Sequence, residues 1–159
     1  MNDHIEKVFF DIHQDIPREG PGDAASTRKA FSMLRPFPLQ PHILDIGCGP
    51  GKQTLDLAQL TEGTIVAVDN HPPFVERLRE QARLAGIADR VNAREGDMFA
   101  LDFEQERFDL IWCEGAIYII GFEQGLRAWN PLLKPGGYMA VTQIAWFQPH
   151  PPQELRGFW

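Results

Sequence analysis

The segment ILDIGCGPG, residues 43–51, decides the fold of this chain. Its first half is a short apolar run typical of a buried strand, and its second half places glycine at every other position. Residues 52–60 follow with the apolar spacing of a helix that packs on a sheet. A strand, a glycine loop and a helix in this order let the backbone approach a ligand at the helix N-terminus.

Strands and helices alternate after this loop. The strand expected at 64–68 is β-branched and apolar throughout, which is typical of a parallel strand covered on both faces. Further strands are expected at 91–95, 108–113 and 138–144, and further helices begin at Pro72 and at about residue 122. Alternation with short connections predicts an α/β fold, a doubly wound, mostly parallel sheet with five strands.

Two helices precede the first strand. The second of them runs from about Asp23 or Ser26 to Leu34. The first shows an apolar stripe at helical spacing, made of Ile5, Val8, Phe9, Ile12 and Ile16. We therefore divide the chain into an N-terminal helical cap (1–41), a core (42–145) and a Pro-rich C-terminal segment (146–159).

Composition excludes several classes of protein. The chain has 159 residues and a formal charge of −7, with no run of Lys or Arg that could follow a phosphate backbone, so no nucleic-acid partner is expected. No apolar run is long enough to cross a membrane, and the N-terminus has no secretory signal. Two cysteines are too few for a disulfide framework and fit a cytoplasmic protein. The five histidines lack ligand spacing, so no metal site is expected.

Asp45 limits the classes of ligand that the glycine loop can bind. It lies two residues before the first glycine, at the carboxyl end of the strand. A carboxylate there would repel the pyrophosphate of NAD and would suit a cationic group such as an ammonium. The glycine spacing also differs from the dinucleotide pattern, and Lys52 is followed by Gln53, which excludes a P-loop. The sequence therefore indicates a cationic, nucleoside-like ligand without phosphate.

Two more acidic residues follow strands at the same edge of the sheet. Asp69 ends the second strand, where an acidic residue accepts hydrogen bonds from ribose hydroxyls, although Asp69-Asn70 can also cap the next helix. Gly96-Asp97-Met98 follows the third strand. Asp97 could accept from an adenine amino group while Met98 supports the ring, but a Gly-Asp turn after a strand is common.

From about residue 42 to 145 the chain resembles the class I methyltransferases, particularly small-molecule enzymes of the ubiquinone and menaquinone biosynthesis type. The glycine loop, Asp69, Asp97-Met98, the strand FDLI at 108–111 and the turn LKPGG at 133–137 match family motifs in the right order. The resemblance implies a Rossmann-like core that binds S-adenosylmethionine and releases S-adenosylhomocysteine, with the N-terminal helices, Arg18 and Gly20-Pro21-Gly22 as a cover. The cofactor contacts it implies are Asp45, Gly47, Cys48, Gly49, Gly51, Asp69, Asn70, Asp97, Met98 and Glu114.

Glu114 is the candidate catalytic residue. It follows the fourth strand beside Asp45, and it would contact the methionine part of the cofactor or accept a proton from the substrate, with a purely structural role as the alternative. Tyr118 could line the same pocket or pack in the core, and Trp146, Phe147, His13 and His150 are weaker candidates. The residues after Trp112 do not match nucleobase methyltransferases, so a small-molecule acceptor is expected, with its attacking atom open.

The C-terminal end differs from the family pattern, because the family continues with an antiparallel pair of strands and this chain ends at Trp159. An open fifth-strand edge is a state that proteins usually avoid. We therefore expect a missing C-terminal part, or a second copy of the chain in a homo-oligomer, to cover that edge.

Two alternatives to an enzyme of this family remain. A cofactor-binding module without turnover would share every motif above. An NAD-dependent oxidoreductase is disfavoured by Asp45 and by the glycine spacing.

Overall fold

The computed structural model describes residues 8, 12, 16–146, 149–150 and 152–156. Its centre is a five-stranded, all-parallel sheet with the strand order β3-β2-β1-β4-β5. The strands are β1 (His42–Ile46), β2 (Thr64–Asp69), β3 (Val91–Glu95), β4 (Phe108–Cys113) and β5 (Leu133–Val141). The predicted α/β fold with five strands is therefore confirmed.

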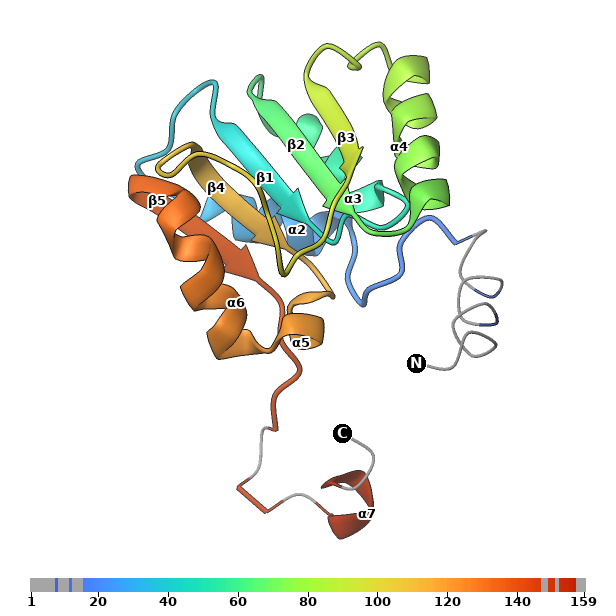
Figure 1. Cartoon of the computed structure of the whole chain (residues 1–159), viewed down its shortest axis with the longest axis vertical. Coiled ribbons are helices and arrows are strands. Elements are labelled where there is room, and N and C mark those ends of the chain that lie inside the picture. The colour runs from blue at the N-terminus through green and yellow to red at the C-terminus, as the bar shows by residue number, and fades with distance from the viewer. Residues whose placement is uncertain (1–7, 9–11, 13–15, 147–148, 151, 157–159) are drawn as a thin grey trace.

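Helices cover both faces of the sheet (Figure 1). One face packs on α2 (Ala24–Ser32), α3 (Lys52–Ala58) and α4 (Pro72–Leu84), and the other on α5 (Ile117–Ile120) and α6 (Phe122–Trp129). A 3-10 turn, η1 (Asn130–Leu132), leads into β5, and α7 (Gln153–Arg156) follows it. Among the described residues no helix is both long and apolar enough to cross a membrane.

Side-chain alternation along β1 determines what reaches each layer. Ile43 and Asp45 face the α2–α4 side, whereas Leu44 and Ile46 belong to the apolar cluster on the α5–α6 side. This period of two is the geometry of an extended strand. Asp45 is thereby turned into the layer between the sheet and α3, where it meets Thr54.

The N-terminal helices are only partly described. The second begins at Ala24, with Asp23 as its N-cap, and ends at Ser32, close to the predicted bounds. The first falls mostly outside the described residues, and of its apolar stripe only Val8, Ile12 and Ile16 are described, all exposed.

The predicted bounds of the fifth strand were wrong. We expected 138–144, but β5 begins at Leu133, which pairs with Phe108, and it ends at Val141. Between Phe108 and Leu110 the register shifts, so that residues 134–137 form an irregularity inside the strand before Tyr138 pairs with Leu110. Thr142, the residue after the strand, still donates its N–H to Cys113 O of β4 at 3.1 Å.

Candidate functional site

The candidate site lies where the strand order reverses. β1 and β4 are neighbours in the sheet, and the chain leaves them in opposite directions, which is where ligands bind in open α/β sheets. Asp45 near the end of β1 pairs with Trp112 of β4, and Glu114 follows that strand. The N-terminal segment 16–23 crosses beneath these carboxyl ends before it enters α2 (Figure 1).

The glycine loop has a backbone that favours glycine. Gly47, Gly49 and Gly51 have φ values of 71°, 52° and 95°, in the left-handed region. A Cβ at Gly51 would lie 2.9 Å from Cβ of Leu78, so glycine here also permits α3 and α4 to approach each other.

Every backbone N–H of the loop already has a partner within the protein. Gly47 and Cys48 donate to Val68 O of β2 at 2.8 and 3.1 Å, and Gly51 donates to Cys48 O at 3.1 Å. Gly49 donates to Oδ2 of Asp69 at 2.8 Å, and Pro50 has no N–H. Loops that bind phosphate direct such N–H groups at the ligand. This loop therefore leaves room for a ligand and lets it come close to the backbone, but it provides no free N–H donors for a phosphate.

Asp45 is a fully buried carboxylate with one unpartnered oxygen. Its Oδ2 accepts from the Thr54 hydroxyl at 2.6 Å, whereas Oδ1 has no hydrogen-bond partner within the described structure. Burial raises the pKa of Asp45 to about 7; the Thr54 hydrogen bond opposes this rise, and the negative charge of Glu114 adds to it. An unpartnered buried acceptor is costly, and a cationic donor would satisfy it.

Asp69 is arranged both to fix the loop and to accept further hydrogen bonds. Each of its oxygens takes one backbone N–H, from His71 at 2.9 Å and from Gly49 at 2.8 Å, which leaves acceptor capacity on both. Burial raises the pKa of Asp69, and these two N–H groups oppose that rise. The helix-capping role and the ligand role considered for this residue are thus compatible. Asn70 beside it is exposed.

Met98 comes close to the glycine loop, as its place after β3 predicted. A Cβ at Gly47 would lie 3.7 Å from Cε of Met98, and the Met98 carbonyl accepts from the Trp129 indole at 3.1 Å. Asp97 is exposed, and its Oδ1 accepts from Phe99 N–H at 2.9 Å. The third-strand turn is therefore brought to the same edge as the loop.

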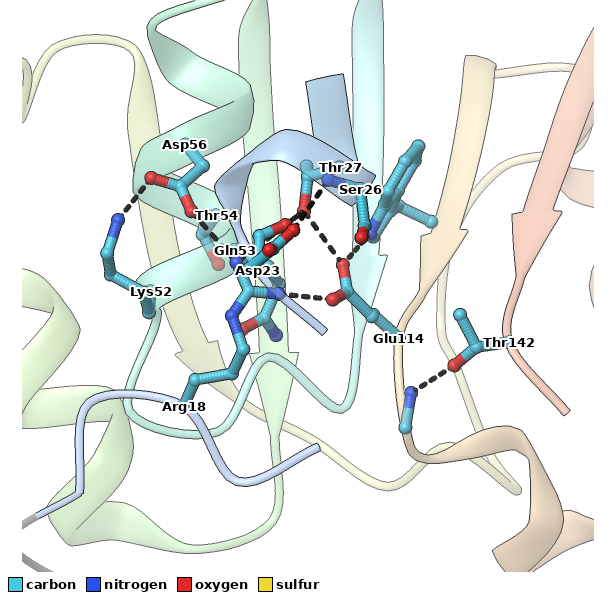
Figure 2. Close-up of polar contacts among 12 residues, drawn as sticks. Arg18, Asp23, Ser26, Thr27, Lys52, Gln53, Thr54, Asp56, Glu114 and Thr142 are labelled. Atoms are coloured by element: carbon cyan, nitrogen blue, oxygen red, sulfur yellow. Dashed lines mark hydrogen bonds and ion pairs between the residues drawn. The ribbon is translucent and has the colours of Figure 1, made fainter. Parts of the chain in front are cut away.

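A buried ion cluster joins the N-terminal segment to two elements of the core (Figure 2). Arg18 forms ion pairs with Glu114 and, at 2.8 Å, with Asp56 of α3, which also pairs with Lys52. The second oxygen of Glu114 accepts from the Thr27 hydroxyl and from the Trp112 indole, each at 3.2 Å. Both oxygens of the candidate catalytic residue are thus engaged by other side chains.

Close contacts at glycine residues also hold the N-terminal segment against the end of β4. A Cβ at Gly115 would lie 2.9 Å from Cα of Gly20, and a Cβ at Gly22 would lie 2.6 Å from Oε1 of Glu114. Only residues without a side chain allow the N-terminal segment to lie this close to the end of β4. The sequence indicated Arg18 and the Gly-Pro-Gly stretch as a cover, but it gave no sign of their partners Asp56 and Thr27.

The other described candidates are exposed. Tyr118 is 56 % exposed and Trp146 48 % exposed, and His150 is exposed; His13 and Phe147 fall outside the described residues. Both cysteines are buried, which raises the pKa of Cys113 to about 12 and that of Cys48 well above its usual range, so neither is a ready nucleophile. The described part of the chain contains no group of three His, Cys, Asp or Glu placed to hold a metal ion.

Several known proteins with a similar sequence or fold are named as methyltransferases. Methyltransferase GfsG of Streptomyces halstedii is 33% identical over 103 residues, 64% of this chain and 37% of that protein. Sterol 24-C-methyltransferase of Debaryomyces hansenii is 31% identical over 102 residues, 64% of this chain and 27% of that protein. A methyltransferase of Geobacter sulfurreducens, solved with S-adenosyl-L-homocysteine, has a TM-score of 0.81 at 22% identity, covering 95% of this chain and 60% of that one.

The chain thus spans about a third of the length of the curated relatives it matches. The family model described as "Methyltransferase domain" matches residues 43–137, more than half of the chain. That range begins in β1 and includes the glycine loop, Asp69, Asp97 and Glu114. The chain belongs to the class I S-adenosylmethionine-dependent methyltransferase family.

Proposed function

We propose that the protein binds S-adenosylmethionine and transfers its methyl group to a small-molecule acceptor. The observation that carries the proposal is Asp45, whose buried Oδ1 has no partner in the described part of the chain and lies beside a glycine loop that offers no free N–H. These features suit a ligand that brings a cation and carries no phosphate. They argue equally against the pyrophosphate of NAD, so an oxidoreductase is not favoured.

The residues that would hold the cofactor are distributed along the edge of the sheet. Asp45 would accept from the ammonium of the methionine part, and Asp69, with Asn70 beside it, from the ribose hydroxyls. Asp97 and Met98 would contact the adenine. The loop residues Gly47, Cys48, Gly49 and Gly51 would provide the floor. When bound, the cofactor supplies an activated methyl group on a sulfonium, so the protein has to position the acceptor and exclude water.

Glu114 has two proposed roles that its contacts help to separate. Glu114 already accepts from Arg18, Thr27 and Trp112, so three of its roughly four acceptor positions are occupied and little of the carboxylate is left for a substrate. We favour an anchoring role, in which Glu114 holds the N-terminal segment over the site. A proton-acceptor role predicts that Glu114→Gln lowers kcat about 10²–10⁴-fold, whereas an anchoring role predicts mainly weaker cofactor binding.

The acceptor is proposed to be a small organic molecule. Support comes from the relative named as a sterol 24-C-methyltransferase and from the absence of clustered Lys or Arg that would bind nucleic acid. Because the chain spans only part of its relatives, a cofactor-binding unit without its own turnover is the second candidate.

Calorimetric titration with S-adenosylmethionine, S-adenosylhomocysteine and NAD tests the cofactor assignment. We expect both sulfur ligands to bind and NAD not to bind. Tight NAD binding without any response to S-adenosylhomocysteine would overturn the proposal. Methyl-labelled cofactor and a pool of small-molecule acceptors then distinguish an enzyme, which labels an acceptor, from a binding unit, which labels none.

A further inference from the structure

A second acidic side chain reaches the glycine loop from the N-terminal segment. A Cβ at Gly49 would lie 3.8 Å from both Cγ and Oε2 of Glu19, and among the described residues, the glycine's own chain neighbours aside, no other comes within 4 Å of that position. Oε1 of Glu19 is buried. We propose that Glu19 is a ligand-binding residue whose carboxylate contacts the positive charge of the ligand in the loop, an inference that rests on the proposed function.

The position of Glu19 is determined by the residues on either side of it. Arg18 is tied to Asp56 and Glu114, and the backbone of Gly20 lies against Gly115. A side chain between two anchored neighbours has little freedom to leave the loop. The contacts that hold the N-terminal segment against the end of β4 therefore also place Glu19 beside Gly49.

The charges around the loop favour a cation. Three carboxylates border it: Asp45 at its start, Asp69 on the N–H of Gly49, and Glu19 on the open side of that glycine. Arg18 and Lys52, the basic residues that neighbour the segment and the loop in sequence, are both directed to Asp56. The negative charges of Glu114 and Asp69 disfavour the ionised form of the buried Asp45, and a bound cation would relieve that repulsion.

Three ligands that share an adenosyl part but differ in charge test this role. S-adenosylmethionine carries an ammonium and a sulfonium, S-adenosylhomocysteine carries the ammonium alone, and 5′-methylthioadenosine carries neither. Loss of a charge-assisted hydrogen bond typically weakens binding about tenfold or more. Glu19→Gln keeps the shape of the side chain. We expect it to weaken the binding of S-adenosylmethionine about tenfold and the binding of 5′-methylthioadenosine by less than twofold.

The dissociation constants are measured by calorimetry on the unaltered protein, Glu19→Gln, Glu19→Asp and the control Glu62→Gln, an exposed residue in the connection before β2. Glu19→Asp, which keeps the charge, should preserve the order of affinities, and the control should change none. If Glu19→Gln lowers the affinity for S-adenosylmethionine alone, Glu19 contacts the sulfonium. If it lowers the affinities for S-adenosylmethionine and S-adenosylhomocysteine equally, Glu19 contacts the ammonium. Either result supports the proposal.

Other results overturn it. Equal weakening of all three ligands in Glu19→Gln would show a structural or adenosyl contact, and unchanged or tighter binding would show that Glu19 does not assist a cation. In both cases the proposed function stands. If the unaltered protein binds none of the three ligands, the proposed function and this inference fail together.

Discussion

Replacing Asp45 by Asn should stabilise the ligand-free protein above neutral pH while it weakens cofactor binding. The carboxylate is fully buried, and its Oδ1 has no partner among the residues described, so its ionised form is destabilised in the folded state. Asn removes the charge and keeps an oxygen that can accept from the Thr54 hydroxyl. The residue that we assign to the cofactor is thus one that the folded, ligand-free protein tolerates poorly.

The magnitude follows from the pKa of Asp45, which burial raises from 3.8 to about 7. Because the folded state binds this proton more tightly than the unfolded state, stability falls as the pH rises through that window. The full difference corresponds to about 4 kcal/mol, of which the part between pH 5 and pH 8 is about 2–3 kcal/mol. For a chain of this size the melting temperature should change by about 5–10 °C over that part.

Thermal unfolding of the ligand-free proteins between pH 5 and pH 8.5 measures this difference. The advantage of Asp45→Asn over the unaltered protein should grow from pH 5 to pH 8 and then level off. The exposed Asp89→Asn serves as control and should follow the unaltered protein. Two curves for Asp45→Asn and the unaltered protein that stay parallel across this range would refute the reasoning, because Asp45 would then titrate alike in both states.

Two further substitutions test the packing around the site. Gly51→Ala combines a positive φ with a clash against Leu78 and should lower the free energy of unfolding, measured in urea, by about 2–4 kcal/mol. Its control Gly86→Ala, also at positive φ but in open space, should lower it by only about 1 kcal/mol. Equal losses in the two variants would show that the clash with Leu78 has no effect. Arg18→Met leaves a buried carboxylate at Glu114 and should cost about 3 kcal/mol, part of which Glu114→Gln should restore in the double variant; strictly additive losses would contradict the ion pair.

Local patterns in the sequence were enough to predict β1, the glycine loop and α3. The apolar run, the alternating glycines and the helical spacing lie within residues 42–60, so neighbours in sequence determine them. The positions of Asp69 and Met98 followed from the parallel order of the strands, which brings their carboxyl ends to one edge. Their contacts with a ligand stay predictions.

Contacts between distant residues could not be predicted. The start of β5 depends on the pairing of Leu133 with Phe108, and the irregularity at 134–137 has no local sign beyond a Pro-Gly-Gly turn. Arg18 and Glu114 are separated by 96 positions, so neither residue indicates the other in the sequence. For that reason the sequence indicated Glu114 as a carboxylate at the edge of the sheet but gave no sign of the side chains that donate to its two oxygens.

The internal hydrogen bonds of the glycine loop have a consequence for the entropy of ligand binding and for hydrogen exchange. Since the N–H groups of Gly47, Cys48, Gly49 and Gly51 are already bonded to the protein, the loop is preorganised and loses little conformational entropy when a ligand arrives. Its amides should exchange slowly with deuterated water both before and after binding.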